Sequence, residues 1–124
     1  MAKILLVEDD EFISRMINMR LTLRKHQVEL AFNGQQAVEK APAGDFDLVL
    51  MDMHMPVMDG HQATRKLRES GYGGLIIAVT ASVMSADSQK AIKSGCDNYI
   101  SKPIGADFED RIEAILKSSE LHLD

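Results

Sequence analysis

The sequence predicts an α/β protein, a doubly wound, flavodoxin-like domain in which a five-stranded parallel sheet alternates with helices. Short apolar runs alternate five times with longer segments whose apolar residues recur at helical spacing. Several runs, such as residues 4–7, are continuously apolar, which is typical of strands buried on both faces of a parallel sheet. This alternation implies right-handed crossovers with helices on both faces. The 124 residues fit a single domain, residues 1–124, without a repeat or a linker.

Each predicted element follows from its apolar pattern and from the turn residues beside it. Strands are expected at residues 3–7, 28–32, 48–51, 75–79 and 97–100. Helices are expected at residues 11–25, 33–41, 61–69, 84–93 and 106–117. Asn33-Gly34 is a turn signal that opens the second helix, and Pro42 ends it. Asp59-Gly60 precedes the third helix, Gly71 follows it, and Gly95 ends the fourth.

Composition limits the classes of function. Nineteen acidic residues against 14 basic ones give a net charge of -5, and no basic run indicates direct binding of nucleic acid. The single cysteine, Cys96, excludes an internal disulfide and suits a reducing compartment. No apolar stretch approaches the roughly 20 residues that a membrane span requires. We therefore expect a cytoplasmic protein without membrane insertion.

Carboxylates, a hydroxyl and a lysine directly follow the predicted strands. Glu8 and Asp9 follow the first strand, Asp52 the third, Thr80 the fourth and Lys102 the fifth. Because the carboxyl ends of parallel strands meet at one edge of a sheet, these side chains should form one site. Crowded carboxylates repel one another unless a cation neutralises them, and an all-oxygen set favours Mg²⁺ over zinc.

Three enzyme classes fit these residues poorly. A nucleotide binder would need a Gly/Ser/Thr-rich loop after the first strand, where acids including Asp10 would repel phosphate. A haloacid-dehalogenase-type phosphatase would carry a second acid two residues after Asp52, and His54 occupies that position. A hydrolase would need a Ser or Cys nucleophile with a paired base. We interpret Asp10 and Glu11 as favourable charges at a helix N-terminus.

Four short motifs together resemble the receiver domain of two-component response regulators. The motifs are Val7-Glu8-Asp9, Leu50-Met51-Asp52-Met53 with Pro56 and Asp59-Gly60, Val79-Thr80-Ala81, and Ile100-Ser101-Lys102-Pro103. They occur in the family's order at four strand ends and cover nearly the whole chain. In style the sequence is closest to single-domain receivers and to the receivers of hybrid kinases.

The resemblance implies a phosphoacceptor chemistry at the strand ends. Asp52 would attack a phosphohistidine or a small phosphodonor, and a carboxylate needs no general base near neutral pH. Mg²⁺ would be ligated by Asp9, Asp52 and the backbone carbonyl of His54, with Glu8 acting through a water. The cation would offset the charge of the transferring phosphoryl group.

The resemblance also implies roles for the last two strands. Lys102 and Thr80 would each contact a phosphoryl oxygen, and the peptide between Lys102 and Pro103 would be cis. On phosphorylation the Thr80 hydroxyl would move toward the phosphoryl group, and the Tyr99 ring would turn into the space that it leaves.

A phosphorylation switch is therefore the expected function. The chain would take its phosphoryl group from a histidine kinase or a histidine phosphotransfer protein and signal to a downstream protein target. It would catalyse its own phosphorylation and dephosphorylate slowly, which differs from a turnover enzyme. Alternatives are a receiver module of a hybrid sensor kinase that passes phosphate to a histidine phosphotransfer protein, a phosphorylation-independent adaptor, and a Mg²⁺-dependent phosphatase.

Two apolar stripes share the first helix and together span about 200° of it, roughly twice what a one-sided helix needs. One stripe is Ile13, Ile17 and Leu21, and the other is Phe12, Met16, Met19 and Leu23. We expect Met19 and Leu23 to pack against the last helix around Ile112 and Ile115. A docking face for the phosphohistidine partner is expected to comprise Phe12, Ile13, Met16 and Ile104.

The remaining histidines, methionines and the cysteine have simpler interpretations. Cys96 is expected to be a small packed residue. Met51, Met53, Met55 and Met58 should pack in the core and the adjacent loop. All four histidines, His26, His54, His61 and His122, are expected to be partly exposed loop side chains.

Overall fold

In a computed structural model, residues 2–55, 57–81 and 85–121 are described, and they form one parallel sheet with helices on both faces. The elements in chain order are β1 (Lys3–Val7), α1 (Glu11–Leu23), β2 (Gln27–Ala31), α2 (Gly34–Lys40), β3 (Leu48–Asp52), α3 (Gly60–Glu69), β4 (Ile76–Thr80), α4 (Ser85–Ser94), β5 (Asn98–Ser101) and α5 (Phe108–Leu121). The strand order is β2-β1-β3-β4-β5, and every neighbouring pair is parallel. The predicted doubly wound, flavodoxin-like fold is confirmed.

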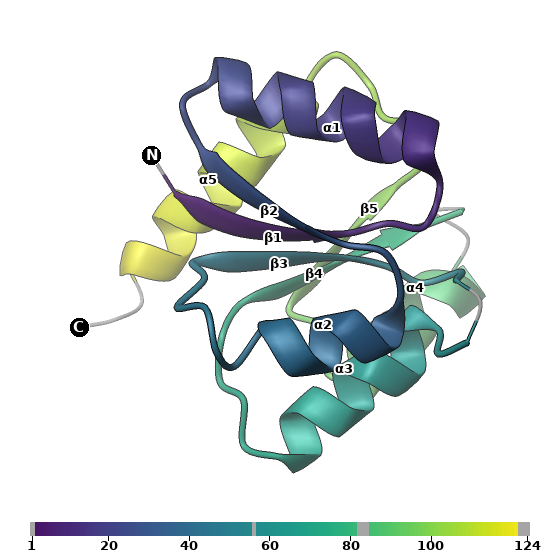
Figure 1. The fold of residues 1–124 in the computed structure, drawn as a ribbon. Coiled ribbons are helices and arrows are strands. Elements are labelled where there is room, and N and C mark those ends of the chain that lie inside the picture. Colours follow the sequence, from purple (N-terminus) through teal and green to yellow (C-terminus); the bar gives the residue numbers. More distant parts are fainter. Residues whose placement is uncertain (1, 56, 82–84, 122–124) are drawn as a thin grey trace.

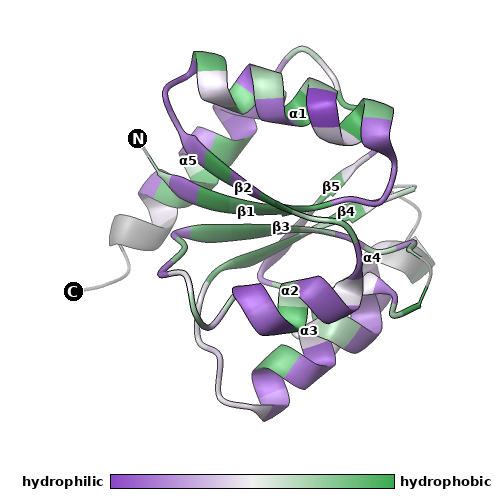
Figure 2. Ribbon diagram, in the orientation of Figure 1, coloured by the Kyte–Doolittle hydropathy of each residue, from purple (hydrophilic) through white to green (hydrophobic). Residues whose placement is uncertain are grey.

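The sheet separates two hydrophobic clusters. Figure 1 shows α1 and α5 on one side of the sheet and α2, α3 and α4 on the other. Successive residues of a strand point to opposite faces, so Leu5 and Val7 belong to the cluster under α2, α3 and α4, whereas Ile4 and Leu6 belong to the one under α1 and α5. Figure 2 shows the strands as mostly apolar, in keeping with a sheet buried on both faces.

Strand register brings the ends of β1 and β3 together. Val7 is the register partner of Met51, so the residues that follow β1 lie beside the end of β3. Asp52 in turn pairs with Val79 of β4, and Thr80 pairs with Ser101 of β5. The carboxyl ends of four strands therefore meet at one edge of the sheet.

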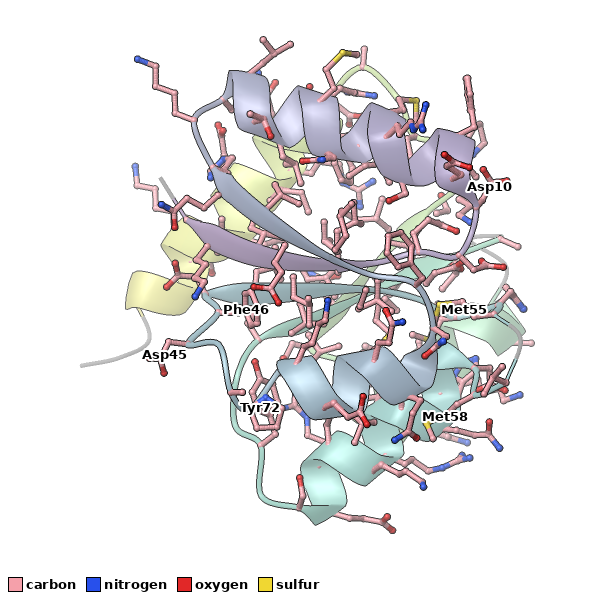
Figure 3. All side chains as sticks on the ribbon, in the orientation of Figure 1. Asp10, Asp45, Phe46, Met55, Met58 and Tyr72 are labelled. Carbon is pink, nitrogen blue, oxygen red and sulfur yellow. The ribbon has the colours of Figure 1, made fainter. Side chains whose placement is uncertain are left out.

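Side-chain caps begin the helices near this edge. Asp10 caps α1 by accepting a hydrogen bond from the Ile13 backbone N–H at 3.0 Å, which confirms its predicted place at a helix N-terminus. Asp59 and Gln62 form a reciprocal capping box at α3. Figure 3 labels Asp10 at the end of the sheet where Met55 and Met58 also lie.

The interior side chains agree in part with the sequence predictions. Met51, Met53, Met55 and Cys96 are buried, and Met58 is half-buried against the same cluster, as predicted. His54 is exposed, as predicted. His122 lies outside the described residues.

The exposure predicted for two histidines is wrong. His26 is buried because the Ala2 backbone N–H donates to its Nδ1 atom at 3.0 Å and its Nε2 atom lies 3.1 Å from a carboxylate oxygen of Glu113 in α5. His61 is buried between α3 and α4, with Nδ1 3.1 Å from the Ser94 hydroxyl.

The predicted packing of Met19 and Leu23 against the last helix is also wrong. Both side chains are exposed, by 59% and 75% respectively. Polar pairs occupy the contact between α1 and α5 instead: the Arg20 guanidinium binds Glu109, and Arg24 forms ion pairs with Asp110 at 3.1 Å and Glu113 at 2.8 Å. The two helices thus share these ion pairs and the buried apolar cluster that contains Ile17, Leu21, Phe108 and Ile112, and Met19 and Leu23 lie outside both.

Candidate functional site

Three carboxylates from β1 and β3 converge at the carboxyl edge of the sheet. Glu8, Asp9 and Asp52 each offer an oxygen atom, and these atoms all lie within 4.8 Å of one another. The Glu8 and Asp52 side chains are only 2% exposed, whereas Asp9 is exposed to solvent. Two buried carboxylates with a third at the surface form a site that is open on one side.

Lys102 provides the positive charge of the site. Its Nζ atom lies 3.2 Å from Glu8 Oε1 and 3.6 Å from Asp52 Oδ2. The Lys102 backbone N–H donates to the Thr80 carbonyl at 2.7 Å, and the Lys102-Pro103 peptide is cis. The lysine therefore reaches the acids from the loop that follows β5.

The three carboxylates carry more negative charge than one lysine can neutralise, and this excess affects the pKa of Glu8. Burial, followed by a hydrogen bond with Asp52 and the negative charge of Asp52, raises the pKa of Glu8 from 4.5 to about 7, although the Asp10 backbone N–H and Lys102 partly oppose the rise. For Lys102, burial lowers the pKa, but attraction to Asp52 and Glu8 outweighs burial, and the net direction is upward. Lys102 is thus a permanent cation, and Glu8 titrates near neutral pH.

The residues fit a hard divalent cation. All three donors are carboxylates, and neither a histidine nor a cysteine joins them among the described residues. Oxygen-only sites with few carboxylates suit Mg²⁺, which keeps several of its waters. A bound dication would also remove the repulsion that raises the pKa of Glu8. The donor set and the surplus of negative charge point to the same ion.

The loop after Asp52 is held close to the carboxylate. The His54 backbone N–H donates to Asp52 Oδ1 at 3.1 Å, a contact that the sequence did not indicate. Gly60 lies so near that an added Cβ would stand 2.3 Å from the Asp52 carbonyl oxygen, so no larger residue fits. The Asp59-Gly60 pair predicted a turn, but this close approach depends on the fold. Val57, in the loop between Asp52 and Gly60, is 86% exposed and has a φ of 70°. This left-handed conformation disfavours β-branched residues.

Thr80 and Tyr99 lie on the neighbouring strands β4 and β5, near the carboxyl edge of the sheet. Thr80 is fully buried at the end of β4. Tyr99 in β5 is half-buried and packs against the cluster under α2, α3 and α4. Its register partner is Ala78, two residues before Thr80 in β4. Ser82, which follows Thr80 by two positions, lies outside the described residues.

The predicted docking residues divide into one exposed and three half-buried side chains. Phe12 is 78% exposed in the first turn of α1 and lines an open hollow of about 480 Å³ with Asp10, Glu11 and Arg15. Ile13, Met16 and Ile104 are half-buried against the cluster under α1 and α5. Only Phe12 therefore offers most of its apolar surface beside the site.

Comparison with known proteins identifies the family. The response regulator receiver domain family matches residues 4–116, and the chain belongs to it. The chain is 43% identical over 110 residues to a two-component response regulator, ORR41, of Oryza sativa subsp. japonica, a match that spans 84% of this chain and 85% of the rice protein. It is 41% identical over 109 residues to hybrid signal transduction histidine kinase G of Dictyostelium discoideum, which spans 82% of this chain but 3% of the kinase.

Solved structures give the same assignment. The receiver domain of a sensor histidine kinase from Pseudomonas aeruginosa, with a magnesium ion in its active-site cleft, is 34% identical with a TM-score of 0.83, covering 94% of this chain and 95% of that one. A Saccharomyces cerevisiae receiver domain, that of Ssk1 bound to the histidine phosphotransfer protein Ypd1, is 28% identical with a TM-score of 0.88, covering 98% and 92%. The protein is thus a receiver domain of two-component and phosphorelay signalling.

Two further observations concern the whole chain. This chain spans about half the length, from 50% to 57%, of several bacterial relatives that it matches, two transcriptional regulatory proteins and a response regulator. Among the described residues, the helices are too short or too polar for any of them to pass through a bilayer.

Proposed function

We propose that this receiver domain accepts a phosphoryl group on Asp52 from a phosphohistidine. The supporting observation is the position of Asp52, a buried carboxylate that lies 3.6 Å from the Lys102 ammonium and within the acidic cluster. The backbone contact from His54 aims one oxygen of Asp52, which leaves the other toward Lys102. Such a carboxylate is held in one orientation, as an attacking group must be, and the exposed Asp9 marks the open side of the site.

The chemistry forms one bond and breaks one. An Asp52 oxygen attacks phosphorus, an O–P bond forms, and the N–P bond of the phosphohistidine breaks with its electron pair left on the imidazole nitrogen. Glu8, Asp9, Asp52 and the His54 carbonyl would hold Mg²⁺, Glu8 through a water, and the ion supplies charge neutralisation at the phosphoryl oxygens. Lys102 holds one phosphoryl oxygen by its ammonium.

We assign the output step to Thr80 and Tyr99. The Thr80 hydroxyl binds a further phosphoryl oxygen, and the half-buried Tyr99 ring turns inward to fill the space. The result is a change at α4, the helix that follows Thr80 in the chain. Thr80→Ala should still accept phosphate at Asp52, but the amide shifts of α4 on phosphorylation should be lost. Wild-type shifts in this variant would contradict the assignment.

Labelling of Asp52 tests the proposal directly. Wild-type protein should take up about one phosphoryl group per chain in a reaction that needs Mg²⁺ and yields an alkali-labile, hydroxylamine-sensitive product, since an acyl phosphate is open to attack at its carbonyl. Asp52→Asn should abolish labelling. Asp45→Asn is the matched control, because Asp45 is exposed and lies at the opposite end of the sheet from the site (Figure 3). Labelling of Asp52→Asn at the wild-type level would refute the proposal.

Removal of a metal-binding acid tests the role of the cation. Asp9→Ala should weaken Mg²⁺ binding because the site loses one of its three carboxylates.

Continuous hydrolysis of a phosphoester by wild-type protein, instead of stoichiometric labelling, would favour a Mg²⁺-dependent phosphatase.

We place partner docking on Phe12, Ile13, Met16 and Ile104. The exposed Phe12 ring beside the acidic site supports this face. Phe12→Ala should slow transfer from a phosphohistidine protein and leave labelling by a small phosphodonor nearly intact. Equal loss with both donors would mean that Phe12 supports the site itself, and equal retention would place docking elsewhere.

A second candidate is an intermediate in a phosphorelay, a receiver module of a hybrid kinase that passes its phosphoryl group to a histidine phosphotransfer protein. The 41% identity to a hybrid kinase and the fold shared with the receiver of the Ypd1–Ssk1 complex favour it. Transfer from labelled Asp52 back to a phosphotransfer histidine distinguishes the two. We further propose a cytoplasmic location, which the lone buried thiol of Cys96 supports.

A further inference from the structure

The outer face of α1 carries an apolar stripe that the rest of the described structure does not cover. This outer stripe consists of Phe12, Met16, Met19 and Leu23. Three of its members are exposed by 78%, 59% and 75%, namely Phe12, Met19 and Leu23, and Met16 is half-buried. A helix packed on one side ordinarily shows polar residues to solvent. Here α1 is apolar on both sides.

The stripe lies opposite the buried side of the helix. At 100° per residue, Ser14, Ile17 and Leu21 face the sheet, and the outer stripe is centred about 180° away from them. Figure 1 shows α1 as the outermost layer on its side of the sheet. A partner could therefore approach the stripe without meeting β1, β2 or α5.

The spacing of the stripe is symmetric. Its residues are separated by four, three and four positions, the spacing of the apolar seam of a coiled coil. Because this spacing reads the same in both directions, a two-fold axis between Met16 and Met19 places Phe12 of one copy opposite Leu23 of another. The stripe is thus complementary to itself in an antiparallel arrangement.

Charge at the two ends of α1 favours the same arrangement. The helix begins with Asp10 and Glu11. At its end Arg24 is already paired with Asp110 and Glu113 of α5, and the exposed Lys25 is the cation that forms no ion pair among the described residues. An antiparallel second copy brings the acidic beginning of each helix next to Lys25 of the other, and the helix dipoles then run in opposite directions. A parallel copy would place like charges together.

We propose that two copies of this chain associate through antiparallel α1 helices. The stripe is about 16 Å long, so each copy buries well under the roughly 800 Å² of a standard interface. The expected dissociation constant is on the order of 10–100 μM. The dimer forms as the local concentration of the chain rises.

The association has a consequence for docking, and this consequence rests on the proposed function. Phe12 and Met16 belong both to the outer stripe and to the proposed docking face. A dimer therefore covers the surface that a phosphohistidine protein would need, and self-association competes with phosphotransfer. Measuring the oligomeric state without a phosphodonor tests the dimer independently of the phosphoryl chemistry.

Sedimentation equilibrium of the full chain tests the proposal. The weight-average mass should rise from 13.7 kDa toward twice that value between about 10 μM and 1 mM. Leu23→Glu should stay monomeric, because it places a charge in the seam at a position outside the docking face. Ile92→Glu is the matched control, since Ile92 is a 45% exposed apolar residue of α4 on the other side of the sheet, and it should dimerise like wild type.

Cysteine trapping tests the direction of the helices. Oxidation of an equal mixture of Phe12→Cys and Leu23→Cys should give the mixed disulfide, while neither variant alone should cross-link, because identical positions lie about 16 Å apart. The native Cys96 is buried and does not compete. A monomer up to 1 mM, a dimer that Leu23→Glu leaves intact, or cross-linking between two copies of Phe12→Cys would each overturn the proposal.

Discussion

Replacing Glu8 by glutamine should stabilise the metal-free protein at pH 8. The pKa of Glu8 in the folded protein is about 7, above its ordinary value of 4.5, because burial and Asp52 disfavour the charged form. Between these two pH values the folded state holds a proton that the unfolded state has lost, so wild-type stability falls as pH rises through the window. Glutamine resembles the protonated acid and does not pay this cost.

The magnitude follows from the two pKa values. Each pKa unit corresponds to about 1.4 kcal/mol, so the rise from 4.5 to about 7 lowers the free energy of unfolding of the wild type by about 3 kcal/mol at pH 8. The gain should shrink to under about 1 kcal/mol at pH 5, where folded wild-type protein already carries the proton. In a chain of this size, 3 kcal/mol raises Tm by about 10 °C.

Thermal or urea unfolding in the presence of EDTA measures the effect. Glu11→Gln is the matched control, because Glu11 is an exposed acid in the same region, 76% exposed and paired with Arg15, and its replacement should change stability by less than about 0.5 kcal/mol at either pH. Mg²⁺ at pH 8 should stabilise the wild type more than Glu8→Gln. An equal gain at both pH values, or a loss at pH 8, would refute the electrostatic reasoning.

Three further predictions concern strain, packing and reactivity. Val57→Asn should raise the free energy of unfolding by about 1 kcal/mol, because asparagine tolerates the left-handed conformation better than a β-branched residue, and a decrease in urea unfolding would contradict the strain. Leu21→Ala should lower the free energy of unfolding by about 3 kcal/mol because Leu21 is fully buried. Leu23→Ala in dilute solution should change it by less than about 0.5 kcal/mol, because Leu23 is exposed. Similar losses for the two variants in urea titrations would contradict the burial pattern. Cys96 should react with a thiol reagent only as fast as the protein opens, since burial, which a hydrogen bond with Thr64 offsets only in part, raises its pKa to about 11. Rapid reaction of the folded protein would contradict this prediction.

The fold could be predicted because β1, β3 and β4 each contain a continuous apolar run and helical patterns separate all five strands. The boundaries were less secure where a strand ends on a polar residue. β4 and β5 extend to Thr80 and Ser101, one residue beyond their apolar runs, since these two residues are register partners at the edge of the sheet. Apolar patterns in the sequence predict the buried part of a strand, but not the residues beyond it whose backbones still pair with the neighbouring strand.

The candidate site was predictable for the same reason, since its residues stand next to strand ends. What depends on distant contacts was not. His26 is buried because a carboxylate 87 residues away, that of Glu113, lies against its ring. Arg20 faces α5 because Glu109 meets it there, which leaves Met19 outside. An apolar stripe in the sequence does not predict which side of a helix will face a neighbouring helix when that contact depends on an ion pair with a residue distant in the sequence.

The acids and the lysine of the site come from different halves of the chain. Glu8 and Asp52 belong to its first half, and the lysine that faces both is residue 102. A ribosome that adds 5–20 residues per second needs about 3 to 10 s to proceed from position 52 to position 102. Throughout that interval the nascent chain carries the acids without their ammonium partner. A divalent cation that binds to the emerging chain would therefore have to neutralise the carboxylates without Lys102. The complete site forms only after β5 and Lys102 have been synthesised.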